Sequence, residues 1–215
     1  SGSATVAHSV HVTAIVVERP TPDGRVFKGV CTNYLKPLAE GSLVRSFVRR
    51  TTFKLPHDPF TSVIMIGAGT GFAPLRGMCM DLDTRRRAGA ALGENMLFFG
   101  CRRQGEDFMY ADEMEGWVQA RTLRHLFLAF SRDPDTFTGK VYVQHKLNDN
   151  ASRVLDLLEG GAYIYVCGAT SMAREIKKAL IASLVFLRGL KGGKAEEYVE
   201  QLHKEGRYHQ DVWST

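Results

Sequence analysis

The amino-acid sequence predicts an α/β protein, in which a doubly wound, mostly parallel sheet follows part of an antiparallel β structure. After about residue 60, near-continuous apolar runs alternate with helix-like segments, the pattern of a parallel sheet covered on both faces. Before residue 60 the apolar runs are short, β-branched and partly alternating, as in antiparallel strands. We therefore expect two domains, residues 10–60 and 61–215, after a flexible leading segment, residues 1–9, that resembles a cloning remnant.

The first domain is expected to contain strands at residues 10–19, 25–33 and 43–55, with the turn "PTPDG" between the first two. Three strands in some fifty residues make a thin sheet, which normally packs on more chain than this.

The second domain is expected to repeat strand and helix. Glycine at 206 should end the final helix and release the tail, residues 207–215. The expected strands are residues 62–69, 95–102, 124–132, 140–147 and 162–168, and the expected helices are residues 73–88, 107–120, 171–190 and 194–206.

Composition excludes several classes of function. The formal charge of +5 suits an anionic ligand but does not require nucleic acid. No stretch approaches the ~20 apolar residues of a membrane span. The four cysteines form no CxxC pair and the seven histidines show no ligand spacing, so we expect reduced thiols in a cytoplasmic setting and no metal.

The stretch "VIMIGAGTGFAP" places Gly67, Gly69 and Gly71 after a buried strand and Pro74 in the first turn of the next helix. Backbone N–H groups at such a helix start bind phosphate well. The stretch is neither the GxGxxG fingerprint nor a P-loop, so a glycine turn that serves only close packing remains equally open.

Four polar side chains lie within twelve residues around an expected strand end: Ser131, Arg132, Lys140 and Tyr142. A hydroxyl, a guanidinium, an ammonium and a phenol suit a phosphomonoester, such as the 2′-phosphate of NADP. An NAD site would offer a carboxylate to the ribose instead. The alternative is a surface loop in which the arginine pairs with an aspartate at 133 or 135.

The spacing of Tyr142 and Lys146 also fits the YxxxK pair of short-chain dehydrogenases, but "KVYVQHK" alternates like a strand and the glycine turn has the wrong form.

Cys167 ends an apolar strand before a helix that Thr170 or Ser171 can cap, and a buried cysteine usually serves packing alone. Trp213, near the end of the chain, either anchors the tail in a groove or covers a flat ligand.

Taken together, these segments resemble the C-terminal FAD/NADPH module of the diflavin reductases, and the cytochrome P-450 reductase branch most of all. The resemblance begins near residue 9 and runs through seven stretches in family order. These are "FKGVCTNYL", "FKLPHDPFTSVIMIGAGTGFAP", "LFFGCRRQGEDFMYADE", "AFSRD", "KVYVQHKL", "GAYIYVCG" and "GRYHQDVWS".

The resemblance implies a ferredoxin-NADP reductase-like NADP-binding domain after part of an antiparallel β-barrel flavin domain. It implies hydride transfer from NADPH to FAD, then electron transfer through FMN, in a domain of the same protein outside this sequence, to a haem protein or other acceptor. It implies neither nucleic-acid binding nor membrane contact by this segment, in a protein that is cytoplasmic or held on the cytosolic face of the endoplasmic reticulum by an N-terminal anchor.

The resemblance also assigns site residues. Cys167, Asp211 and Trp213 match residues that tune hydride transfer, the tryptophan by stacking on the flavin until the nicotinamide displaces it. The matched nucleotide-binding positions are Gly69, Thr70, Gly71, Cys101, Arg102, Ser131, Arg132, Lys140, Tyr142, Gln144, Gly168 and Met172 for NADP, and Gly29, Val30, Cys31 and Thr32 for the FAD pyrophosphate.

Three departures qualify the match: the family's Arg-x-Tyr-Ser flavin motif lies upstream of this sequence, Ala169 stands where the family usually has Asp, and Thr215 follows the usual terminal "WS". FAD binding by this sequence is therefore expected to be incomplete. Two alternatives stay open, a nucleotide-binding fragment without turnover and a single-flavin ferredoxin-type reductase, although the ending "DVWS" disfavours the latter.

Overall fold

The computed structural model describes residues 9–133 and 139–214. The described chain divides into two compact units, one formed by Val12–Thr51 and the other by residues 9–11, 52–133 and 139–214. Within the described ranges, the helices are too short or too polar to span a membrane.

The Val12–Thr51 unit contains two short antiparallel strands and one helix. Strand β1 (Glu18–Pro20) pairs with β2 (Val26–Lys28), and helix α1 (Val30–Leu35) follows directly. The expected strands at 10–19 and 25–33 are thus correct only in part, and the one at 43–55 is wrong, because those residues form no strand in the described chain. Alternation reveals β propensity, but a strand also needs a neighbouring backbone. Leu43 and Val48 are almost fully exposed.

The larger unit is built on a five-stranded sheet in which every strand is parallel to its neighbours. The strand order is β5-β4-β3-β6-β7, so the chain starts near the middle, moves to one edge, and crosses back to the other. The strands are β3 (Val63–Ala68), β4 (Met96–Cys101), β5 (His125–Phe130), β6 (Tyr163–Ala169) and β7 (Tyr208–Trp213). The predicted doubly wound fold is confirmed.

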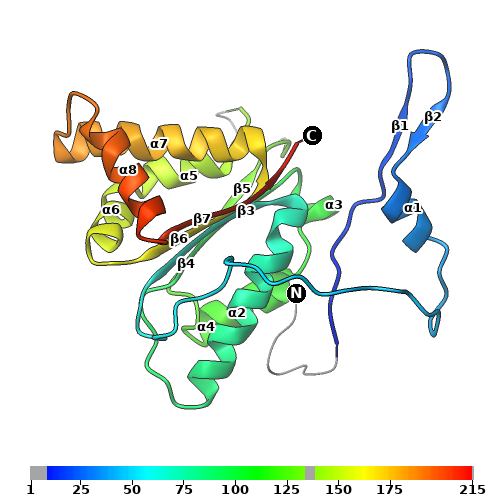
Figure 1. Ribbon diagram of the computed structural model, residues 1–215, viewed down its shortest axis with the longest axis horizontal. Coiled ribbons are helices and arrows are strands. Elements are labelled where there is room, and N and C mark those ends of the chain that lie inside the picture. Colours follow the sequence, from blue (N-terminus) through cyan, green and yellow to red (C-terminus); the bar gives the residue numbers. More distant parts are fainter. Residues whose placement is uncertain (1–8, 134–138, 215) are drawn as a thin grey trace. The chain divides into compact units, whose positions relative to one another are not determined.

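Helices cover both faces of this sheet (Figure 1). A separate apolar core fills each interface between helices and sheet. One face carries α5 (Val143–Asp149), α6 (Ala151–Glu159), α7 (Thr170–Arg188) and α8 (Lys194–Lys204). The other carries α2 (Phe72–Arg87) and α4 (Ala111–Gln119), with the short α3 (Gln104–Asp107) at the end of β4. Burial on both sides explains why the central strands are almost wholly apolar.

Two expectations about the strands of this unit are wrong. Residues 140–147 were expected as a strand, yet α5 starts at Val143 and buries Val143 and Leu147, a spacing of four that puts both on one helix face. The tail was expected to be released after Gly206, yet Tyr208–Trp213 joins the sheet as β7, paired to β6 along six residues. Tyr208 is buried in the core, so burial holds the end of the chain in place.

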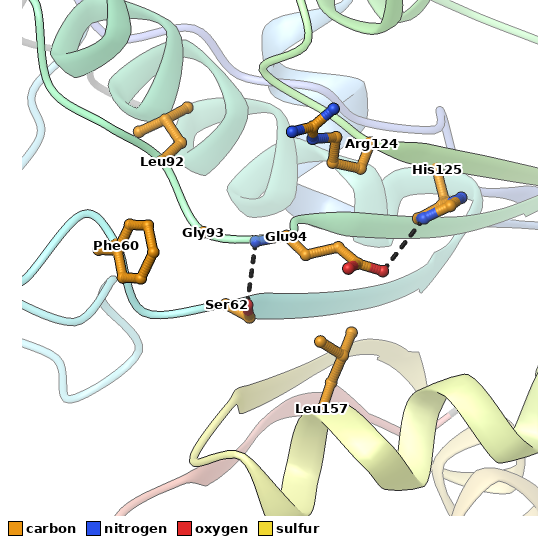
Figure 2. Close-up of a pocket in the computed structure, with 8 residues that line it drawn as sticks. All are labelled: Phe60, Ser62, Leu92, Gly93, Glu94, Arg124, His125 and Leu157. Atoms are coloured by element: carbon orange, nitrogen blue, oxygen red, sulfur yellow. Dashed lines mark hydrogen bonds and ion pairs between the residues drawn. The ribbon is translucent and has the colours of Figure 1, made fainter.

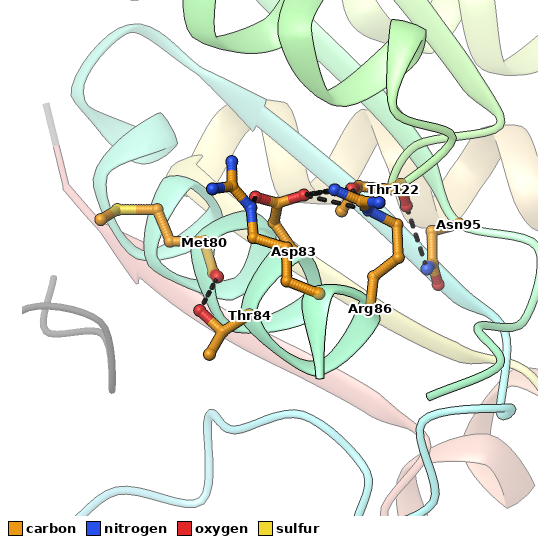
Figure 3. A network of polar contacts seen from close by, with 7 residues as sticks. Met80, Asp83, Thr84, Arg86, Asn95 and Thr122 are labelled. Atoms are coloured by element: carbon orange, nitrogen blue, oxygen red, sulfur yellow. Dashed lines mark hydrogen bonds and ion pairs between the residues drawn. The ribbon is translucent and has the colours of Figure 1, made fainter. Parts of the chain in front are cut away.

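The edge of the sheet where the strands begin is held by a buried polar network (Figure 3). The carboxylate of Asp83, near the end of α2, accepts hydrogen bonds from the Thr122 hydroxyl at 2.7 Å and the Arg86 guanidinium at 2.9 Å, and it also pairs with Arg87. The side-chain amide of Asn95 donates to the Thr122 carbonyl oxygen. The end of α2 is thereby fixed to the segments that lead into β4 and β5.

Candidate functional site

The glycine turn lies at the carboxyl end of β3, where Gly69–Gly71 form a 3-10 turn, η2, that leads into α2. A Cβ on Gly71 would lie 2.1 Å from the carbonyl oxygen of Cys167, so this glycine packs directly on β6. Gly69 differs, because its φ of +54° is a conformation that glycine adopts without strain and a Cβ there would face open space. The turn therefore combines a packed side with an open one.

Pro74 sits in the first turn of α2, as predicted, and no side chain of the described chain caps this helix start. Thr70 is partly buried in the middle of the turn. The first N–H groups of a helix have no partner within it, but here the Phe72 amide donates to the carbonyl oxygens of Gly69 and Thr70, and Pro74 has no N–H. The N–H groups that could face an anion or water are therefore those at the start of η2.

The three residues matched to hydride transfer lie at the carboxyl ends of β6 and β7. Cys167 is opposite Asp211 and Ala169 is opposite Trp213 in the register of the two strands. Because strand side chains alternate, Asp211 and Trp213 share one face of β7. Cys167 is buried, and burial together with the Asp211 charge raises the pKa of its thiol to about 12. The thiol is therefore protonated at neutral pH, while Asp211 is exposed and Trp213 is 39% exposed.

Gly168 and Met172 complete this strand end, since a Cβ on Gly168 would lie 2.8 Å from the methionine methyl carbon. Helix α7 begins next with Ala169 as its N-cap and no side-chain cap. The expected capping by Thr170 or Ser171 is therefore wrong. An alanine cannot accept the N–H groups that a capping side chain would satisfy, so these also point toward solvent or a ligand.

The carboxyl ends of β4 and β5 bring the polar residues around Cys101 and Ser131 together. The Ser131 amide donates to the Cys101 carbonyl oxygen at 3.0 Å, and the Arg132 amide donates to the Arg102 carbonyl oxygen at 2.8 Å. The guanidinium of Arg132 is exposed and forms no ion pair with another residue in the described ranges. One proposed partner in the packing alternative, the aspartate at 135, lies outside the described residues.

Lys140, Tyr142 and Gln144 surround the start of α5, for which Tyr142 is the N-cap. A Cβ on Gly100 would lie 2.9 Å from Val143 Cγ1, so this helix start is adjacent to the end of β4. Lys140 and Tyr142 are exposed and Gln144 is half-buried. The structure thus places these side chains at the same edge of the sheet as Arg132.

The four residues matched to the FAD pyrophosphate lie at the start of α1 in the smaller unit. Gly29 is the N-cap, with no side-chain cap in the described chain, and Val30 is 89% exposed. Thr32 accepts a hydrogen bond from the Val17 amide at 3.1 Å, which ties the helix to the residue just before β1. Cys31 is exposed.

Sequence reasoning missed Asp107, whose carboxylate accepts the backbone N–H groups of Arg102 and Arg103 after β4. The signal was present in "CRRQGED", because an aspartate a few residues after a strand end often accepts hydrogen bonds from local backbone amides.

A pocket of about 540 Å³ lies at the opposite edge of the sheet (Figure 2). Its lining includes Glu94, which binds both His125 and Arg153. The hydrogen bond from the Arg153 guanidinium is the main cause that holds the pKa of Glu94 below its usual range. The acid in this pocket is thus already paired with the Arg153 guanidinium. The residues matched to NADP binding and hydride transfer lie at the other edge of the sheet.

Comparison with known proteins identifies the domain that carries these strand ends. The family model for the oxidoreductase NAD-binding domain matches residues 65–178, which include the glycine turn and the ends of β4, β5 and β6. The chain is 41% identical over 221 residues to the NADPH–cytochrome P450 reductase of Homo sapiens, covering 100% of this chain and 32% of that protein. It is also 41% identical over 211 residues to the enzyme of that name from Drosophila melanogaster, covering 95% of this chain and 30% of that protein.

These similarities confirm the resemblance to the cytochrome P-450 reductase branch. The chain spans about a third of the length of the curated relatives it matches.

Proposed function

Since the chain belongs to the family of oxidoreductase NAD-binding domains, we propose that it is the nucleotide-binding module of an NADPH-dependent flavoprotein reductase. NADPH supplies a hydride to FAD, whose electrons pass through FMN in another domain to a haem protein or other acceptor. The observation that carries the proposal is the meeting of an open glycine turn with the paired ends of β6 and β7.

The turn η2, which leads into α2, is proposed to bind the pyrophosphate. Gly69 leaves open space beside the backbone, and Gly71 lets the turn approach β6, so the bound dinucleotide would lie across β3 and β6. This is the crossover point of the sheet, where the strand order reverses, and ligands of open α/β sheets bind at such a point.

The end of β5 and the start of α5 are proposed to bind the 2′-phosphate and adenosine. Ser131, Arg132, Lys140 and Tyr142 offer two positive charges and two hydroxyls, and Gln144 adds an amide. A phosphomonoester at neutral pH carries roughly −1.5 to −2 charge, so two cations can compensate for most of it. NAD, which lacks this phosphate, would leave both cations without their ligand.

Cys167, Asp211 and Trp213 are proposed to control the nicotinamide end. The protonated thiol of Cys167 can donate a hydrogen bond, and the Asp211 carboxylate can stabilise positive charge. Trp213 presents a partly exposed ring at the strand end, where it can cover a flat ring and exclude water. The start of α1, Gly29 to Thr32, is proposed to bind the FAD pyrophosphate in the smaller unit.

The proposed partners are the FMN domain of the same protein and a haem protein, with attachment to the cytosolic face of the endoplasmic reticulum through an N-terminal anchor. The family branch supports them, since the relatives are named as cytochrome P450 reductases.

The decisive test is calorimetric titration of the chain with NADP⁺ and, separately, with NAD⁺. We expect tight binding of NADP⁺, weak binding of NAD⁺, and a loss of about 1.5–3 kcal/mol for NADP⁺ in Arg132→Ala, the usual range for a charged hydrogen bond. The matched control is Arg124→Ala, because Arg124 is also exposed and precedes β5 where Arg132 follows it.

Equal affinity for both nucleotides, or the same loss in Arg124→Ala, would exclude the proposed phosphate site. Absorbance near 450 nm, a property of bound flavin, separately reports whether the chain retains FAD.

A further inference from the structure

The loop that follows β4 is held by one carboxylate. The Arg102 amide lies 3.0 Å from both oxygens of Asp107, and the Arg103 amide lies 2.8 Å from Oδ1. Asp107 closes the short helix α3, so its side chain reaches back across one turn to the strand end. Two successive N–H groups thus point at a single acceptor and fix the path of the loop.

The same loop fixes the backbone of Arg132. The Arg102 carbonyl oxygen accepts the Arg132 amide at 2.8 Å, and Arg103 Nε donates to the Arg132 carbonyl oxygen at 3.2 Å. Arg132 is therefore bonded on both sides of its Cα to the two residues that Asp107 holds. Its own guanidinium remains exposed.

We propose that Asp107 is a positioning residue for 2′-phosphate recognition: it orders the Arg102–Arg103 loop, which in turn holds Arg132 at the phosphate. This inference rests on the proposed function, since it assumes that Arg132 binds the phosphate. It assigns to an acidic residue, which would repel a phosphate by direct contact, a role in preferring the phosphorylated nucleotide.

The charge of Asp107 is compatible with this role because the loop amides compensate for it. Burial raises the pKa of this carboxyl, but the hydrogen bonds from the Arg103 and Arg102 amides outweigh burial and hold the pKa below its usual range. Asp107 is thus ionised at neutral pH and accepts from the backbone, not from the ligand. Because the loop is already ordered, binding costs less conformational entropy than it would with a mobile arginine.

The test compares Asp107→Ala with Asp107→Asn by titration with NADP⁺, NAD⁺ and 2′,5′-ADP, a probe that carries the 2′-phosphate without the nicotinamide. Alanine removes both acceptor atoms, whereas asparagine keeps Oδ1, which accepts from both amides. We expect Asp107→Ala to weaken NADP⁺ and 2′,5′-ADP by about 5- to 10-fold, part of the loss expected for a charged hydrogen bond, while NAD⁺ changes by less than about 2-fold. Asp107→Asn should recover most of that affinity.

Two controls separate positioning from charge and from folding. Glu115→Ala removes one negative charge from an exposed site on the neighbouring α4 and should leave all three affinities unchanged. Adding Asp107→Ala to Arg132→Ala should cause no further loss of NADP⁺ affinity, because a residue that acts through Arg132 has no effect without it. Amide hydrogen exchange should report faster exchange at Arg102 and Arg103 in Asp107→Ala, whatever the nucleotide.

Equal weakening of NADP⁺ and NAD⁺ in Asp107→Ala, or an undiminished additional loss in the double variant, would overturn the inference and leave the proposed function intact. A wild-type chain that binds NADP⁺ and NAD⁺ equally would overturn both.

Discussion

The parallel sheet has a first edge, where its strands begin, and a second edge, where they end. The two edges use similar side chains in opposite ways. Where the strands begin, Asp83 binds Arg86 and Arg87, and Glu94 binds Arg153. Where they end, the Arg132 guanidinium has no ion pair within the described chain. These three arginines at the first edge are paired with carboxylates of the protein. Arg132 at the second edge is instead held through its backbone, and its guanidinium is exposed.

The difference shows how a structural arginine can be told from a binding one. A guanidinium bonded to a partly buried carboxylate cannot leave it without cost, and this makes it part of the fold. An arginine whose main chain is hydrogen-bonded and whose side chain is exposed has a fixed backbone, and its guanidinium is available to a ligand. The comparison predicts that substitutions at the first edge change stability alone and that those at the second also change nucleotide binding.

The largest effect is expected from Gly71→Ala, at the second edge. Its Cβ would lie 2.1 Å from a backbone oxygen of β6, which no side-chain rotation can relieve. The turn must move, and we expect a loss of about 3 to 5 kcal/mol in the free energy of unfolding, measured by urea denaturation. Nucleotide binding should be lost with it, because the turn carries the proposed pyrophosphate site.

The matched control for this substitution is Gly116→Ala in the middle of α4, where an added Cβ meets nothing within 4 Å. An alanine there should stabilise the chain by about 0.5–1 kcal/mol, because glycine is a poor helix former. Similar unfolding curves for the two variants would contradict the close approach of η2 to β6.

Asp83→Ala tests the first edge and should produce the next largest effect. It leaves Arg86 and the buried Thr122 hydroxyl without their acceptor, so we expect a loss of about 2 to 3 kcal/mol. Asp81→Ala removes a more exposed carboxylate, which pairs with Arg85, and should cost no more than about 0.5 kcal/mol. Nucleotide preference should be unchanged in both; a change in the Asp83 variant would break the comparison.

The pH dependence of stability gives a second measurement on Asp83. Burial raises the pKa of this carboxyl, but hydrogen bonds from Thr122, Arg86 and Arg87 outweigh burial and lower it from the ordinary value of 3.8. Its ionisation therefore stabilises the fold fully above that ordinary value, and the stabilisation is lost as the pH falls through the lowered pKa. Urea unfolding at about pH 7 and about pH 3 should show a smaller acid loss in Asp83→Asn than in the wild type.

The sequence predicted the buried part of the fold and missed what depends on tertiary partners. The strands ending at Ala68, Cys101 and Ala169 are apolar on both faces, so their composition alone indicates a parallel sheet. Residues 140–147 were predicted as a strand because "KVYV" alternates, whereas the burial of Val143 and Leu147 follows a helical spacing. The tail was not predicted as a strand because β7 carries three consecutive polar residues, His209 to Asp211, and is an edge strand with a single neighbour.

The candidate site was predictable as a set of residues but not as a geometry. Arg132 could be proposed from the sequence because it follows a strand end beside other polar groups. The bonds from Arg102 and Arg103 that hold it join residues about thirty positions apart, and no local pattern specifies them. The same holds for Gly71, because the backbone that leaves no room for a side chain there belongs to Cys167 on β6, almost a hundred residues away.

The smallest effect is expected from Trp213→Ala, at the second edge. It should change nucleotide binding with little change in stability. Because the ring is 39% exposed, its removal should change the free energy of unfolding by less than about 1 kcal/mol. If the ring occupies the place of the nicotinamide, the variant should bind NAD⁺ about 5-fold more tightly, while NADP⁺, already held by its 2′-phosphate, gains less. Phe186→Ala, which removes an 87% exposed aromatic from α7, should change neither affinity. An unchanged ratio of NADP⁺ to NAD⁺ affinity in Trp213→Ala would mean that the ring only anchors β7, and the second edge would then select its nucleotide through the phosphate alone.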